Sequence, residues 1–122
     1  MSKQRRVLLK AAAATTLLGA LPAARAQGRI FFGIATGGTG GTYYPLGGML
    51  AQLISNKVVI GGQKMSATAE TAGASVANAQ LLGRKEIESA FVAADILDAA
   101  FNGKNQFDGK PVKSLRALGA LY

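Results

Sequence analysis

A segment rich in glycine and threonine, residues 36–45, constrains this chain more than any other stretch. It reads Thr-Gly-Gly-Thr-Gly-Gly-Thr-Tyr-Tyr-Pro and lies between an apolar run at residues 30–35 and a helical pattern at residues 46–54. A strand followed by a glycine-rich turn and a helix start is typical of anion sites. Glycine lets a ligand approach the backbone and permits positive φ, helix starts present free N–H groups, and threonine hydroxyls add donors. The alternative is a flexible turn that carries glycine for backbone reasons alone.

Two well-known glycine-rich loops do not fit this segment. A P-loop needs a lysine after its last glycine, and no lysine occurs between Gly33 and Lys57. A dinucleotide-binding turn needs a third glycine where this chain has Tyr43. The sequence therefore predicts an anion site of another kind.

The first 26 residues have the layout of a cleavable export signal. A basic start is followed by an apolar stretch, residues 11–21, and by the small-residue pattern Ala24-Arg25-Ala26, with cleavage expected before Gln27. The apolar stretch is shorter than the roughly 20 residues of a membrane-spanning helix. Residues 4–10, Gln-Arg-Arg-Val-Leu-Leu-Lys, resemble a twin-arginine signal, and general Sec export is the alternative. We expect an exported, periplasmic protein.

The charge of the remaining chain argues against nucleic acid as a partner. The whole chain has a net charge of +8, but removing the signal leaves nine basic and six acidic residues, a net charge of +3. These basic residues are scattered, whereas a nucleic-acid interface gathers them in a stripe. The excess modestly favours small anionic solutes.

The chain contains no cysteine and no histidine. The usual zinc sites and the nucleophile systems built on cysteine or histidine are therefore absent from these residues. A lipid anchor on a cysteine after the cleavage site is excluded as well, so we expect a soluble protein. We expect no metal, no cofactor and no enzymatic activity.

Hydrophobic periodicity predicts alternating strands and helices after the signal. Strands are expected at residues 29–35, 64–70, 87–93 and 114–122, and helices at 45–55, from the end of a turn at residues 71–75 to about Leu82, and at about 95–101. Residues 56–63 are expected to form a loop, Gly83 to stop the second helix, Asp95 to cap the third and Asn102-Gly103 to end it. The first helix is expected to bury an apolar face made by Leu46, Met49, Leu50, Leu53 and Ile54.

This order predicts an α/β fold with a parallel sheet. Ligands of such sheets bind beyond the carboxyl ends of the strands, which here means the loops at residues 36–45, 70–75 and 93–95. The strand-like run at residues 118–122 reaches the last residue of the chain. We therefore expect a truncated piece of a larger lobe.

Four ordered blocks of sequence resemble one family of transport receptors. They are residues 33–48, 67–78, 101–104 and 109–118. Together they are similar to the N-terminal part of TAXI-type solute-binding proteins, the extracytoplasmic receptors of one class of TRAP transporter. The resemblance covers essentially the whole segment after the signal.

The resemblance implies a two-lobed periplasmic binding protein of type II-like architecture, in which residues 27–122 form the first part of lobe one. Its ligand would be a small carboxylate, a glutamate-like amino acid or a dicarboxylate, held between closing lobes. Its partners would be the membrane permease subunits. Two other functions stay open: a solute-sensing module for a signalling partner, and an exported α/β enzyme with an anion-binding loop.

By position, the resemblance implies ten ligand-binding residues at the carboxyl ends of the strands. Ser75 has an alternative role as a simple helix N-cap, and Tyr44 has one as a packing residue ahead of Pro45. After the third expected strand the chain has Ala93-Ala94, where the resembled relatives often carry Gln-Asn or Gln-Ser, so the identity of the solute stays open. The ten residues are Thr36, Gly38, Thr39, Gly40, Gly41, Thr42, Tyr43, Tyr44, Ser75 and Asn78.

Overall fold

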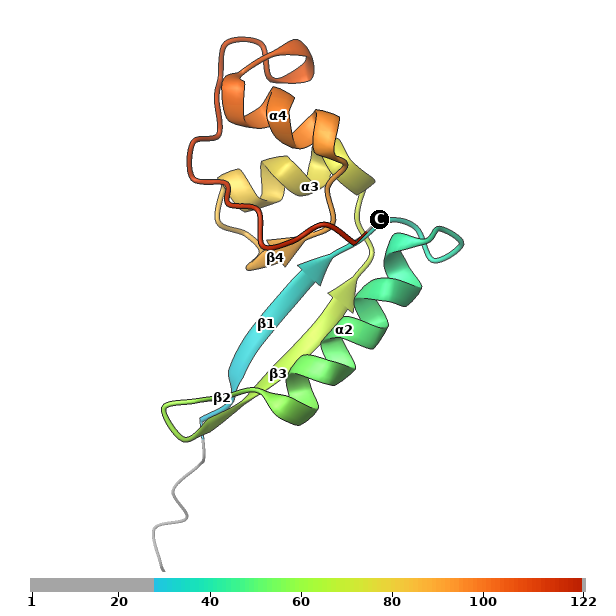
Figure 1. The fold of residues 1–122 in the computed structure, drawn as a ribbon, viewed down its shortest axis with the longest axis vertical. Coiled ribbons are helices and arrows are strands. Elements are labelled where there is room, and N and C mark those ends of the chain that lie inside the picture. The colour runs from blue at the N-terminus through green and yellow to red at the C-terminus, as the bar shows by residue number, and fades with distance from the viewer. Residues whose placement is uncertain (1–27, 122) are drawn as a thin grey trace, which may run out of the picture.

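The computed structural model describes residues 28–121 (Figure 1). The predicted export signal at residues 1–26 lies outside the described residues. In chain order the elements are β1 (Ile30–Ala35), α2 (Tyr43–Lys57), β2 (Val59–Ile60), β3 (Gln63–Glu70), α3 (Ala74–Gly83), β4 (Ser89–Ala90), α4 (Ala94–Asn102) and a short 3₁₀ turn (Asn105–Phe107). None of these helices has both the length and the hydrophobicity needed to cross a membrane.

The strands form one mostly parallel sheet in the order β2-β3-β1-β4. The central strand β1 is parallel to β3, from Ile30 opposite Met65 to Ala35 opposite Glu70, and it is also parallel to β4. Parallel strands need crossover connections, and α2 and α3 supply them here. The predicted α/β class with a mostly parallel sheet is confirmed.

The expected loop at residues 56–63 is wrong in part, because β2 lies within it. β2 is antiparallel to β3, and the two strands are joined by Gly61 and Gly62. Both glycines have positive φ, 58° and 79°. This is the backbone that a two-residue hairpin turn requires, since it matches the twist of the flanking strands. The Gly-Gly pair was therefore a hairpin signal.

α2 packs against the sheet through small residues. Gly47 and Ala51 are its buried positions. A Cβ on Gly47 would lie 2.5 Å from Thr36 Cγ2 and 3.4 Å from Ala69 Cβ, so the helix backbone approaches the end of β1 more closely than a side chain would allow. On β3, Met65 is buried and Thr68, on the opposite face of the strand, is exposed.

The apolar face predicted for this helix is therefore wrong at three positions. Met49 and Leu53 are 61% and 57% exposed, and Leu50 is exposed as well. Leu46 and Ile54 are half-buried. The close contact at Gly47 leaves no room for large side chains against the sheet, so the helix turns its small residues inward.

A second layer of packing lies between α3 and α4. Its core consists of alanines and two larger side chains, with partly buried aliphatic residues around it. Figure 1 shows α3 and α4 beside one another, with the chain after α4 folding back over them. The core residues are Ala79, Ala99, Ala100, Phe107 and Leu115.

Two expected strands are shorter or absent. The strand expected at residues 87–93 is formed only at Ser89–Ala90. Beside it, the N–H of Gly33 in β1 donates to the carboxylate of Glu88 at 2.7 Å. Residues 114–121 form no strand, which contradicts the prediction. Among the described residues, the backbone of 116–121 donates no hydrogen bond to the sheet, and Leu118 is 89% exposed.

The helix ends differ from the prediction by a few residues. α2 begins at Tyr43 rather than Pro45, α3 includes Gly83, and Ala93 rather than Asp95 precedes α4. The expected end of α4 is confirmed, because Gly103 caps it in the left-handed conformation, at φ 67°. Early in a helix a proline costs no hydrogen bond, so Pro45 fits the third position of α2.

The contact at Gly47 can be tested with neighbouring glycines of the same helix. A Cβ on Gly48 meets no atom within 4 Å, so Gly48→Ala is expected to stabilise the fold by about 0.5–1 kcal/mol through helix propensity. Gly47→Ala is expected to destabilise it by about 1–3 kcal/mol, because the new methyl overlaps Thr36. Urea unfolding measures both. Equal stabilisation by the two variants would contradict the close contact.

Candidate functional site

The predicted ligand loop and the start of α3 lie side by side at one edge of the sheet. β1 and β3 end at this edge, and α2 and α3 begin there (Figure 1). A Cβ on Gly37 would lie 3.8 Å from Ala74 Cβ and 4.0 Å from Tyr43 Cβ. The tertiary structure therefore brings together the segments at residues 36–45 and 70–75, as the parallel sheet predicted.

The loop is a tight and accessible turn. The N–H of Gly41 donates to the carbonyl of Gly38 at 2.9 Å, and residues 38–42 are exposed. A Cβ on Gly38 or Gly40 would meet no atom within 4 Å. None of the loop glycines is among the residues with positive φ, so the expected use of left-handed backbone does not occur here. Their contribution is the lack of a side chain, which leaves the backbone open to solvent.

Two helix starts at this edge lack both a side-chain cap and an acid in the first turn. Thr42 precedes α2 and Gly73 precedes α3; neither makes a side-chain capping bond, and neither helix has an acidic residue in its first turn. Each helix start has a partial positive charge of about half an elementary charge, with N–H groups that lack a helical partner. The pair of helix starts therefore favours an anion.

The start of α3 is also strained. Ala74 has φ 59°, in the left-handed region that a residue with a Cβ seldom adopts. Such a conformation costs on the order of 1–3 kcal/mol and persists only where the surrounding structure holds it. The strain lies at the point where α3 meets Gly37.

Thr36, one of the predicted ligand residues, is fully buried. Its N–H and its hydroxyl both donate to the carbonyl of Glu70, at 2.9 and 2.8 Å. These two bonds join the ends of β1 and β3. The hydroxyl of Thr36 is thus already used within the protein.

Asn78 is also fully buried, and its amide connects three segments. Its Nδ2 donates to the carbonyls of Thr36 and Phe91, both at 2.8 Å, and to that of Ala35 at 3.3 Å. Its Oδ1 has no partner among the protein atoms. Asn78 therefore holds the ends of β1 and β4 against α3.

Ser75 and Tyr43 connect the site to the segment after β4. The hydroxyl oxygen of Ser75 accepts a hydrogen bond from the N–H of Ala93 at 2.9 Å. The N-cap of α3 is Gly73, so the alternative of Ser75 as a simple N-cap is wrong. Tyr43 stacks on Phe91, with ring centroids 5.4 Å apart and planes at 27°. Tyr44 is half-buried and stays a predicted contact.

Phe91 is the residue at this edge that sequence reasoning missed. Its N–H donates to the carbonyl of Ala35 at 3.0 Å, which fixes it beside the end of β1. The sequence predicted a ligand loop at residues 93–95, close to this region, but it placed Phe91 within the strand expected at residues 87–93. Because β4 ends at Ala90, Phe91 lies at the edge and not within the sheet.

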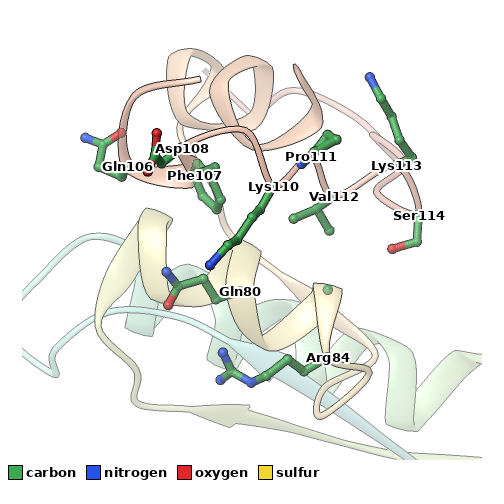
Figure 2. A pocket seen from close by; sticks show the side chains of 11 residues that line it. Gln80, Arg84, Gln106, Phe107, Asp108, Lys110, Pro111, Val112, Lys113 and Ser114 are labelled. Carbon is green, nitrogen blue, oxygen red and sulfur yellow. The ribbon is translucent and has the colours of Figure 1, made fainter. Parts of the chain in front are cut away.

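A separate groove of about 540 Å³ lies between α3 and the segment around residues 106–114 (Figure 2). Figure 2 shows Lys110 reaching toward Gln80 across it. Below Lys110, Arg84 donates to Glu86 at 2.7 Å, and this hydrogen bond lowers the pKa of the exposed Glu86 carboxyl. None of the residues that line the groove belongs to the predicted ligand site.

The buried and exposed threonines should respond differently to substitution. Thr36→Val removes a hydroxyl that donates to Glu70, and we expect the free energy of unfolding to fall by about 1 kcal/mol. Thr39→Val changes an exposed side chain, so the change should stay within about 0.5 kcal/mol. Chemical unfolding measures both. A Thr36 variant as stable as the parent would show that the hydroxyl is not holding the strand ends.

Comparison with known families supplies the class of protein. A model of the NMT1-like family matches residues 34–122, well over half of the chain. The matched region begins within β1 and includes the loop, the starts of α2 and α3, and the segment that carries Phe91 and Ala93. The chain therefore belongs to the NMT1-like family, a family of the periplasmic solute-binding type.

Proposed function

We propose that this protein is the solute receptor of a TRAP-type transporter of the TAXI class and binds a small carboxylate. The solute classes implied by the resemblance to TAXI-type receptors are glutamate-like amino acids and dicarboxylates. The receptor works outside the cytoplasm and delivers its solute to membrane permease subunits. Membership of a solute-binding family and the layout of residues 1–26 support this role.

One observation carries the proposal: two helix starts without an acid in their first turn lie beside an exposed turn. α2 and α3 both begin at the edge where residues 38–42 expose their backbone, and neither has an acid in its first turn. Free N–H groups and partial positive charge together bind carboxylates without any charged side chain. Thr39 and Thr42 add exposed hydroxyls to the same edge.

In this role the protein catalyses no reaction and holds its solute by noncovalent contacts. The sequence contains neither histidine nor cysteine. Within residues 28–121 no group of three or more acidic side chains is placed to hold a metal ion. The lack of histidine and cysteine is the feature of the sequence that weighs against the exported enzyme considered above.

Titration calorimetry tests whether the receptor recognises a carboxylate. The full-length protein is titrated with amino acids, dicarboxylates and monocarboxylates, each paired with the amide of the same skeleton. We expect saturable binding of an acid and at least about tenfold weaker binding of its amide, since only the acid carries the charge that the helix starts favour. Binding of neutral solutes alone would refute the proposed function.

An acid placed at each end of α2 tests the helix start itself. Thr42→Asp puts a carboxylate at the N-terminus, and we expect weaker carboxylate binding together with a stability gain of about 0.3–1 kcal/mol. Asn56→Asp, near the other end of the helix, is the matched control and should leave binding unchanged while slightly lowering stability. If both variants bind the solute like the parent, the start of α2 does not contact its carboxylate.

A further inference from the structure

The orientation of the Asn78 amide is fixed by its surroundings. The three groups bonded to its nitrogen are the backbone carbonyls of Ala35, Thr36 and Phe91, which can only accept hydrogen bonds. Turning the amide over would place its Oδ1 against these three oxygens. Among the protein atoms of residues 28–121, Oδ1 has no partner, so Asn78 uses its donors and leaves a buried acceptor unpaired. That arrangement is unfavourable for the oxygen, and it points to a role carried by the nitrogen.

Two of the three carbonyls depend on Asn78 alone. Within residues 28–121, no other donor forms a hydrogen bond with the carbonyl oxygens of Thr36 and Phe91. The carbonyl of Ala35, by contrast, also accepts from the N–H of Phe91. The N–H and the hydroxyl of Thr36 are held by Glu70. Asn78 therefore sets the orientation of the peptide units that follow Thr36 and Phe91.

Both of these peptide units lead into the proposed site. The exposed turn at residues 38–42 leaves the sheet through Gly37, which is buried and directly follows Thr36. The segment after Phe91 leads to Ala93, the residue that precedes α4. A change in the direction of either peptide unit would move the part of the site that follows it.

We infer that Asn78 is a positioning residue of the proposed site. Through the carbonyls of Thr36 and Phe91 it fixes the directions in which the ligand loop and the segment after β4 leave the sheet. Asn78 is 0% exposed, so it acts through the backbone groups that it holds. The inference rests on the proposed function only for the use of this site in solute binding, because the positioning is a property of the solute-free protein.

Asn78→Asp removes the donors with little change of shape. Burial and the facing carbonyl oxygens disfavour the anion, so they raise the pKa of the new carboxyl above its ordinary value of about 3.9. The protonated acid can donate one hydrogen bond, and the anion can donate none. The loss of stability relative to the parent is therefore smallest below about pH 4 and increases as the pH rises through the raised pKa. In the full-length protein, we expect the midpoint of thermal unfolding to fall by at least about 5 °C at pH 8 and by less at pH 4.

Asn56→Asp is the matched control for this pH dependence. Asn56 is exposed near the end of α2, so its difference from the parent should change little between pH 4 and pH 8. β1 and α3 contain no titratable side chain, and the acids of the neighbouring segments, Glu70, Glu88 and Asp95, are exposed and present in parent and variant alike. A deficit of Asn78→Asp that is independent of pH would show that the amide donors do not hold the carbonyls, and it would overturn the inference.

Backbone amide NMR spectra distinguish positioning from general support of the fold. Residues 38–42 make no hydrogen bond to Asn78. In the folded Asn78→Asp protein at pH 8, at a temperature below its unfolding midpoint, we expect the amide signals of residues 38–42 and 92–94 to shift, and to return toward the parent's positions at pH 4. If the signals of residues 38–42 stay in place while stability falls, Asn78 supports the fold without positioning the loop.

Hydrogen exchange in the parent protein tests the inference without any variant. The side-chain N–H protons of Asn78 are bonded in the interior and should exchange with solvent slowly, as core amides do, whereas those of the exposed Asn56 should exchange fast. Equally fast exchange at Asn78 refutes the inference. None of these measurements needs a solute, so their failure leaves the proposed function standing, and a failure of carboxylate binding leaves the positioning role standing.

Discussion

The buried amide of Asn78 joins the two packing units of this structure. One unit is the sheet with α2, and the other is the α3–α4 pair with its alanine-rich core. From α3, Asn78 donates to carbonyls at the end of β1 and directly after β4. A buried donor that serves three acceptors fixes their relative positions, because an unpaired carbonyl in the interior is costly. These bonds hold the first residue of the predicted ligand loop, Thr36, together with α3 and Phe91.

The site that results is built from backbone groups, and its buried side chains position them. Thr36 and Asn78 hold strand ends, and Ser75 holds the start of the α4 segment. The turn at residues 38–42 is exposed and the starts of α2 and α3 carry no side-chain cap, and in the proposed function these backbone groups face the solute. Such a site needs no histidine or cysteine, which suits a solute-binding family and the chain's composition.

The sequence predicted elements best where the signal was local. The strand–turn–helix unit around residues 30–57, the alternating strand ending at Glu70 and the glycine end of α4 all follow from periodicity and capping. The hairpin of β2, the short β4 and the unpaired residues 114–121 were missed. Strand pairing depends on which edge lies within reach, and an apolar alternating pattern carries no information about that.

The sequence by itself determined the α/β class and the glycine–threonine turn between β1 and α2, because these depend on neighbours along the chain. From the same local patterns it predicts a site at the strand ends. Only the tertiary structure decided which face of α2 is buried, since that follows from the contact between Gly47 and Thr36. It also decided that the polar groups of Thr36 and Asn78 bond to distant carbonyls. The partner of a hydroxyl or an amide is set by distances between segments far apart in sequence, and residue types alone do not contain those distances.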